Sequence, residues 1–147
     1  MTQEEKNILL KDLCSRLLYG VIVHFCNTLI DEELTEIGIG KVVQEVRHNG
    51  KGNQCKVLPY LRPMSSMTED ERQEARDKFF AGSDHYDIDD IGEILADTYQ
   101  PYESVYTLSF PRLTGYIDWL NKKKFDYRDL ISKGLALPAP EWMYKTE

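Results

Sequence analysis

The chain of 147 residues has no long hydrophobic run. Its most apolar stretch, residues 17–23, is interrupted by Tyr19 and Gly20 and is far shorter than the about 20 apolar residues that a membrane-spanning helix needs. A secretory leader would begin with basic residues followed by an apolar run, whereas this chain begins MTQEE. We therefore expect a protein without a membrane span and with a cytoplasmic location.

Cysteine is scarce, and no cysteine spacing is typical of a metal site or a disulfide framework. The three cysteines, Cys14, Cys26 and Cys55, make an odd number, and free thiols in a reducing compartment are the simplest interpretation. His24, Cys26, His48 and Cys55 could in principle hold zinc, or supply a nucleophilic Cys–His pair. Their spacing matches no known zinc motif, and no oxyanion hole is identifiable. We expect no metal and no cofactor.

Motifs that specify a reaction are also lacking. Asp87, Asp89 and Gly92 match three positions of a calcium-binding loop, but Ile91 and Thr98 occupy two of its ligand positions. The segment 38–41 has neither the spacing nor the hydroxyl residue of a phosphate-binding loop. The sequence specifies no reaction and favours a protein that is not an enzyme.

The charge is negative overall and unevenly distributed. The net charge is −7, which opposes binding to nucleic-acid phosphates. Residues 84–103 contain seven acidic residues and no lysine or arginine, whereas residues 41–62 have a net charge of +4. The alternative hypothesis is therefore that this basic segment contacts nucleic acid, through the residues Lys41, Arg47, Lys51 and Lys56.

The first half predicts a helix and then a strand. Thr2 and Glu5 have the spacing of a capping box, and leucines recur at helical intervals up to Gly20. Residues 21–26 then alternate in a pattern with two largely apolar faces, which is typical of a strand covered on both sides.

The next segment predicts more strands. Residues 37–46 alternate in a strand-like way, and Asn49-Gly50 indicates a hairpin or a longer loop. Residues 55–61 predict the returning strand, in which Pro59 favours an edge or the end of the strand. Four or five short strands here indicate a small antiparallel sheet or an SH3-like barrel.

The second half predicts mainly helices. Thr68 and Glu71 repeat the capping-box spacing and open a helix that ends near Gly82. Later helices are indicated over residues 88–95, 113–120 and 126–134, with a short strand over 105–110. Asp126 is the expected N-cap of the last helix, and Gly134 its closing residue. The fold class is α+β, with an N-terminal helix and sheet lobe over 1–66 and a mostly helical lobe over 67–147 that packs on it as one unit.

Aromatic residues are concentrated in the second half, where thirteen of the sixteen lie beyond residue 75. Most should form the core of that half. Trp142 and Tyr144 follow two prolines in the tail and either clamp the tail onto the domain or bind a partner. Trp119 and Tyr127 complete the set of candidate partner-binding residues.

Five segments of the chain carry a resemblance to a known family: DLCSRLLYGV at 12–21, LPYLRPMSSMTE at 58–69, IDWLN at 117–121, FDYRDLI at 125–131 and KGLAL at 133–137. They resemble a family of short uncharacterised proteins from gut Bacteroidales and their phages and prophages. The family tends to have proline where Leu18 stands here. The resemblance covers about a third of the chain and implies a bacterial or phage setting, without implying an activity.

The leading hypothesis is a non-enzymatic protein-interaction or accessory module of phage or mobile-element origin. A small barrel that contacts nucleic acid, or a small enzyme with an unrecognised pocket, is the alternative. The sequence specifies neither the protein partner nor the oligomeric state.

Overall fold

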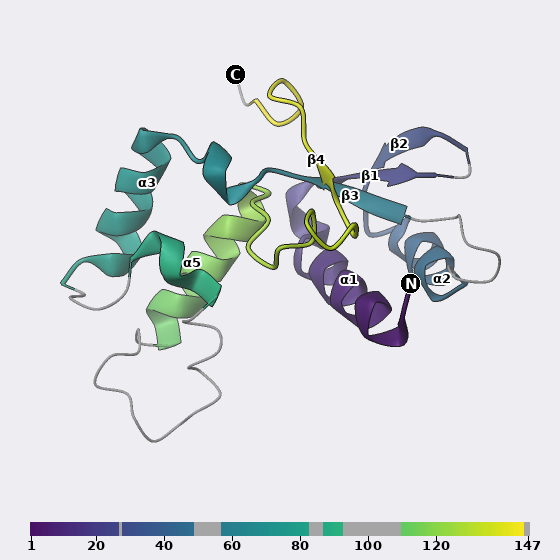
Figure 1. Cartoon of the computed structure of the whole chain (residues 1–147), viewed down its shortest axis with the longest axis horizontal. Coiled ribbons are helices and arrows are strands. Elements are labelled where there is room, and N and C mark those ends of the chain that lie inside the picture. Colours follow the sequence, from purple (N-terminus) through teal and green to yellow (C-terminus); the bar gives the residue numbers. More distant parts are fainter. Residues whose placement is uncertain (27, 49–56, 83–86, 93–109, 146–147) are drawn as a thin grey trace.

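The computed structural model describes residues 1–26, 28–48, 57–82, 87–92 and 110–145. It confirms an α+β class in which an N-terminal helix precedes a sheet (Figure 1). The elements in chain order are α1 (Gln3–Ser15), η1 (Leu17–Tyr19), β1 (Ile22–Phe25), β2 (Ile30–Glu33), α2 (Ile39–His48), β3 (Val57–Leu61), η2 (Met64–Ser66), α3 (Glu69–Ala75), the π-helical turn η3 (Arg76–Phe80), η4 (Ile88–Asp90), α5 (Phe110–Lys122) and β4 (Leu137–Pro138).

Helix α1 begins at the predicted capping box. The hydroxyl of Thr2 accepts a hydrogen bond from the backbone N–H of Glu5 (3.1 Å), and the Glu5 carboxylate accepts one from the N–H of Thr2 (2.7 Å). Leu9 and Leu13 lie one turn apart on the buried face. Gly20, in the left-handed region with φ of 69°, ends the turn η1 that follows.

The sheet is open and mixed, with strand order β2-β1-β3-β4. β1 pairs antiparallel with β2 and with β3, whereas β4 pairs parallel with β3. The described residues form this open sheet and no SH3-like barrel. A purely antiparallel sheet is wrong, because residues 137–138 pair parallel with β3. The sequence also did not indicate β2, whose four residues are exposed and mostly acidic.

Pro59 lies inside β3, opposite Val23 of β1. Parallel pairing with β4 begins one residue later, at Tyr60. Proline cannot donate to a ladder, and it is tolerated here because β3 has a paired strand on only one side at this residue.

Residues 39–48 form the helix α2, so the predicted strand over 37–46 is wrong. Ile39, Val42 and Val46 follow the i, i+3, i+7 spacing of one helical face, and the two valines are buried. β-branched residues lower helix propensity by only about 0.5 kcal/mol each, which burial of that face outweighs. The hairpin at 49–50 lies outside the described residues, as do Lys51, Cys55 and Lys56.

Helices α3 and α5 confirm two further predictions. Thr68 caps α3 by accepting from the N–H of Glu71 (3.2 Å), whose carboxylate accepts in return from the N–H of Thr68 (3.2 Å). A methyl group on Gly115 of α5 would come within 3.0 Å of the Phe79 ring, so this glycine allows α5 and η3 to approach closely. The predicted strand over 105–110 and the end of the segment 88–95 lie outside the described residues, apart from Phe110, which begins α5.

Residues 126–134 form successive turns, so the predicted last helix is wrong. The Asp126 carboxylate does accept from two backbone N–H groups, those of Leu130 (2.8 Å) and Ile131 (2.9 Å). Asp129, however, has a φ of 59°, which interrupts any right-handed helix between them. Gly134 has the positive φ expected of a closing residue.

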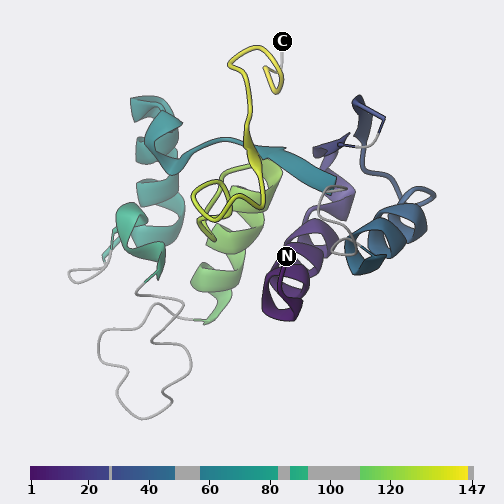
Figure 2. The ribbon, with the colours of Figure 1, turned by 45° about the vertical axis from the view of Figure 1, so that its right-hand side comes forward.

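The hydrophobic core consists of two clusters on either side of the segment that leaves β3 (Figures 1 and 2). One lies between α3, η3, η4 and α5 and contains residues from 67 to 127. The other lies under the sheet, against α1 and α2, and also takes in Leu130, Leu135 and Ala136 from the second half. The division at residues 66 and 67 stays a prediction.

Within the described ranges, no helix is long and apolar enough to cross a membrane.

Candidate functional site

The C-terminal tail joins the sheet as its edge strand β4 and carries two of the four candidate aromatic residues. β4 pairs with β3, and the N–H of Ala139 donates to the carbonyl oxygen of Leu61 (2.8 Å). A turn follows, closed by a hydrogen bond from the N–H of Met143 to the carbonyl oxygen of Pro140 (3.0 Å). This turn brings Tyr144 back toward the sheet.

Tyr144 fastens the tail to both central strands. Its hydroxyl accepts from the N–H of Ile22 in β1 (2.9 Å) and donates to the carbonyl oxygen of Tyr60 in β3 (2.8 Å). The pairing of Val23 with Pro59 places Ile22 opposite Tyr60. The hydroxyl therefore stands where a direct hydrogen bond between the strands would otherwise form.

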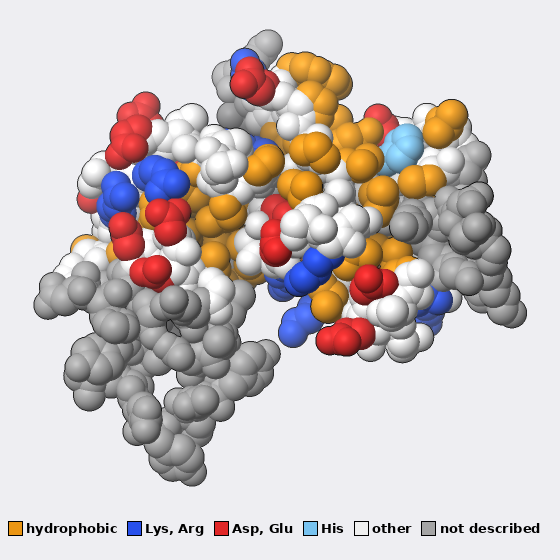
Figure 3. Space-filling model, viewed as in Figure 1, with side chains coloured by type: hydrophobic (Ala, Val, Ile, Leu, Met, Phe, Trp, Pro, Cys, Tyr) orange, Lys and Arg blue, Asp and Glu red, His pale blue; other side chains and the backbone are white. Residues whose placement is uncertain are grey.

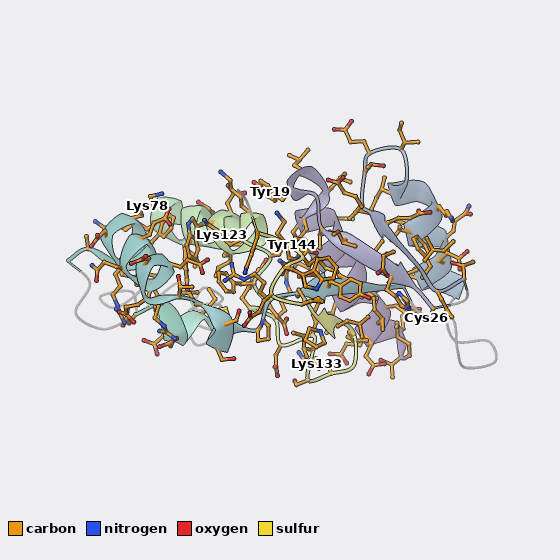
Figure 4. All side chains as sticks on the ribbon, turned by 90° about the horizontal axis from the view of Figure 1, so that it is seen from above. Tyr19, Cys26, Lys78, Lys123, Lys133 and Tyr144 are labelled. Atoms are coloured by element: carbon orange, nitrogen blue, oxygen red, sulfur yellow. The ribbon has the colours of Figure 1, made fainter. Side chains whose placement is uncertain are left out.

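The surroundings of Tyr144 keep its hydroxyl protonated. Burial raises the pKa of Tyr144 to about 12, which the hydrogen bond from Ile22 only partly opposes. The Lys124 ammonium lies 5.2 Å from the centre of the ring. Figure 4 shows Tyr144 pointing into the middle of the molecule, between the sheet and α5.

Trp142 has the opposite environment. Its side chain is 71% exposed, on the same turn that Tyr144 fastens. Figure 3 shows hydrophobic side chains on the tail, at the top of the view, and over the adjoining middle of the molecule. The structure thus separates the two tail aromatics, because Tyr144 holds the tail and Trp142 projects into solvent.

The other two candidate aromatics belong to the interior. Trp119 is buried on α5, where it stacks with Tyr116 and with Phe125 at ring-centre distances of 6.1 and 6.0 Å. Tyr127 is buried as well and donates from its hydroxyl to Oδ1 of Asn121 (3.0 Å). Burial leaves these two rings little area to offer a partner.

The described basic candidates lie on a helix instead of a hairpin. Lys41 and Arg47 are exposed residues of α2. The ammonium of Lys41 lies 4.8 Å from the centre of the Phe25 ring, and the carbonyl oxygen of Arg47 accepts from Lys6 Nζ (3.1 Å). Neither contact tests the nucleic-acid hypothesis.

A polar cluster on the outer face of the sheet could not be found from the sequence, because it joins three strands. Nδ1 of His24 donates to Oδ1 of Asp31 (2.6 Å), and the Tyr60 hydroxyl donates to the same carboxylate (3.3 and 3.4 Å). Burial and the Asp31 carboxylate raise the pKa of Tyr60. Cys26 directly follows β1, two residues after His24.

This cluster contains His24, which belongs to both the zinc hypothesis and the nucleophile hypothesis. Asp31 orients the His24 imidazole, which is the role of the third group in a catalytic triad. The side chains of the part of the chain that the structure describes form no group of three that could hold a metal ion. His48's side chain and Cys55 lie outside that part.

A buried ion cluster, also missed from the sequence, fastens α1 to the segment after α5. Asp12 accepts from Nε (2.8 Å) and Nη2 (3.0 Å) of Arg16, and from Nη1 of Arg128 (2.6 Å). Arg16 also donates to the carbonyl oxygen of Phe125 (2.8 Å). Asp12 and Arg16 are fully buried, so the cluster serves the fold more directly than any ligand. The available signal was an Asp–Arg pair four residues apart, beside the leucines at positions 9 and 13 that face the core.

Comparison of the chain with protein-family models, with curated proteins and with solved structures finds no match in any of the three.

Proposed function

We propose that this protein is a non-enzymatic protein-interaction or accessory module of phage or mobile-element origin, and that Trp142 is the residue that anchors its partner. The observation that carries the proposal is the contrast between the two tail aromatics. Tyr144 makes two hydrogen bonds to the sheet, whereas Trp142, two residues earlier, is 71% exposed.

The tail is preorganised for such a contact. β4 and the Tyr144 hydroxyl hold both ends of the turn, so a partner would not have to order the backbone that presents the indole. Tryptophan is enriched at the centre of interfaces, where its truncation commonly costs at least about 2 kcal/mol of binding free energy. The partner expected here is a protein with an apolar pocket, rimmed by an acceptor for the indole N–H.

The test is affinity capture from a Bacteroidales host, in line with the family resemblance, followed by binding measurements with the purified partner. We expect the wild-type protein to capture a partner, and Trp142→Ala to bind it at least about thirtyfold more weakly. Leu18→Ala is the matched control, because Leu18 is also a large hydrophobic residue with 76% exposure.

An unchanged dissociation constant for Trp142→Ala, with both variants folded, would contradict the proposal. Equal losses in Trp142→Ala and Leu18→Ala would also contradict it, because they would indicate general hydrophobic adhesion.

A further inference from the structure

We propose that the outer edge of β2 binds an extended, basic segment of another protein, which joins the sheet as an additional strand. This surface is distinct from Trp142, and the inference does not depend on the function proposed for the tail. It combines three features of β2: backbone hydrogen-bonding groups that point away from β1, a charge of one sign and apolar side chains at both ends.

The backbone of β2 presents two residues to the open edge. The N–H of Leu34 donates to the carbonyl oxygen of Val21 (2.8 Å), which makes this pair a hydrogen-bonded one. In an antiparallel ladder such pairs alternate, so Glu32 bonds toward β1 while Asp31 and Glu33 direct their N–H and C=O groups away from it. An incoming strand would bond to these two residues.

The edge is accessible. All four residues of β2 are exposed, and β2 is a terminal strand of the sheet. Figures 1 and 2 show it at the periphery of the molecule, with no described element alongside its outer edge.

The charge of this region specifies the chemistry of the partner. Residues 28–36 contain four acidic residues and no lysine, arginine or histidine. A second copy of the chain that paired through the same edge would place these carboxylates opposite one another, which is destabilising. A strand with lysine or arginine would form favourable cross-strand pairs instead.

Apolar residues flank the acidic strand on both sides. The described residues include five exposed large hydrophobics, of which Leu29 (77%), Ile30 (49%) and Ile37 (97%) lie at or near the ends of β2. Charged residues alone would protect an edge from unwanted pairing. Exposed apolar residues at both ends would weaken this protection, because they favour association. They suit a partner strand whose own ends are apolar.

Part of the edge is already ordered. The Asp31 carboxylate is held by His24 and Tyr60, the first through a 2.6 Å hydrogen bond, so the β1–β2 hairpin is braced from the outer face of the sheet. A partner strand would therefore add to a preformed template.

The probe is a fluorescent peptide of about ten residues that alternates lysine with valine or threonine and has leucine near both ends. Fluorescence anisotropy measures its binding to the full chain, and amide hydrogen exchange locates it. We expect saturable binding that weakens with salt, and new protection at the amides of Asp31 and Glu33. Trp142→Ala should bind this peptide as the wild type does.

Two perturbations separate strand addition from simple charge attraction. The same peptide with alternate backbone nitrogens methylated keeps its charge but cannot bond to an edge, and we expect it to bind at least about tenfold more weakly. Glu33→Pro removes an N–H that points away from β1, so it should weaken binding to a similar degree while leaving the melting curve nearly unchanged.

The charge control compares Glu32→Lys, which is within β2, with Glu36→Lys, which is outside it. Both substitutions change the net charge by the same amount. The first should weaken binding about tenfold and the second by less than about threefold. The proposal would be overturned if the methylated peptide bound as tightly as the unmethylated one, or if the two lysine variants weakened binding equally. Self-association of the chain through this edge, measured by sedimentation, would also overturn it. The proposal would also be overturned if the peptide showed no saturable binding at low salt.

Discussion

Replacing Tyr144 with phenylalanine removes one oxygen atom and two hydrogen bonds. The hydroxyl accepts from Ile22 (2.9 Å) and donates to Tyr60 (2.8 Å), whereas the ring and its contact with Lys124 remain in the variant. Each hydrogen bond contributes about 0.5–1.5 kcal/mol net, so we expect the free energy of unfolding to fall by about 1–3 kcal/mol.

Urea denaturation measures this change. With a slope of about 2 kcal/mol per molar urea, the middle of the range for small proteins, the midpoint should fall by roughly 0.5–1.5 M. Hydrogen exchange at the Ile22 amide should accelerate in parallel, because the N–H loses its acceptor. Trp142→Ala is the control, since truncating a side chain that is 71% exposed should change the free energy by less than about 0.5 kcal/mol.

The effect should also depend on pH in a defined direction. A tyrosine has a pKa of about 10 in an unfolded chain, and that of Tyr144 is raised to about 12. The protonated hydroxyl therefore stabilises the fold fully below pH of about 10, and this contribution is lost as the pH rises toward about 12. The difference in stability between the wild type and Tyr144→Phe should narrow across this interval.

An unchanged Tyr144→Phe variant would contradict this role for the hydroxyl. If β1 and β3 can close the gap and form the direct Ile22–Tyr60 hydrogen bond, Tyr144→Phe will melt like the wild type and the Ile22 amide will stay protected. The tail would then be fastened by β4 alone, and Trp142 would not be presented by a turn that is held at both ends.

Four further variants test the core, the buried ion cluster and a helix cap, each by urea denaturation. Leu120→Ala should cost about 2–5 kcal/mol, because Leu120 is fully buried in the cluster around α5, and a silent variant would contradict that packing. Asp12→Ala should cost about 3–5 kcal/mol, because Arg16 stays buried without its carboxylate, and Arg128→Ala should cost less. Burial alone would raise the pKa of Glu71, but its hydrogen bonds with Arg62 and Thr68 outweigh burial and lower this pKa. The stability of the wild type should therefore fall as the pH drops below about 4.5, and Glu71→Gln should lose less stability over the same pH range.

The sequence was most informative where a few neighbouring residues determine the local structure. Both capping boxes, at Thr2 and at Thr68, begin helices as predicted, because the hydrogen bonds that form them span three residues. Gly20 and Gly134 adopt the positive φ that a chain reversal after a helix or turn requires. The spacing of apolar residues in α5 was also sufficient to predict that helix.

Local pattern was not sufficient where distant burial decided the outcome. In α2, β-branched residues suggested a strand, although Ile39, Val42 and Val46 also have helical spacing. Burial of the two valines in the core beneath the sheet decides in favour of the helix. In residues 126–134 the expected cap atoms do bond, but Asp129 adopts a left-handed conformation within a segment that packs on the ion cluster of α1.

The candidate site depended on tertiary structure almost entirely. The sequence placed Trp142 and Tyr144 in one aromatic tail and left open whether they clamp it or bind a partner. Their roles diverge because the parallel pairing of β4 with β3 brings one ring onto Ile22 and Tyr60 and leaves the other in solvent. The His24–Asp31–Tyr60 cluster likewise depends on tertiary structure, because it needs β1 to pair with both β2 and β3. Composition and short spacings determined the fold class and the helix starts, whereas contacts between residues up to 122 positions apart determined which side chains meet and which are free to bind.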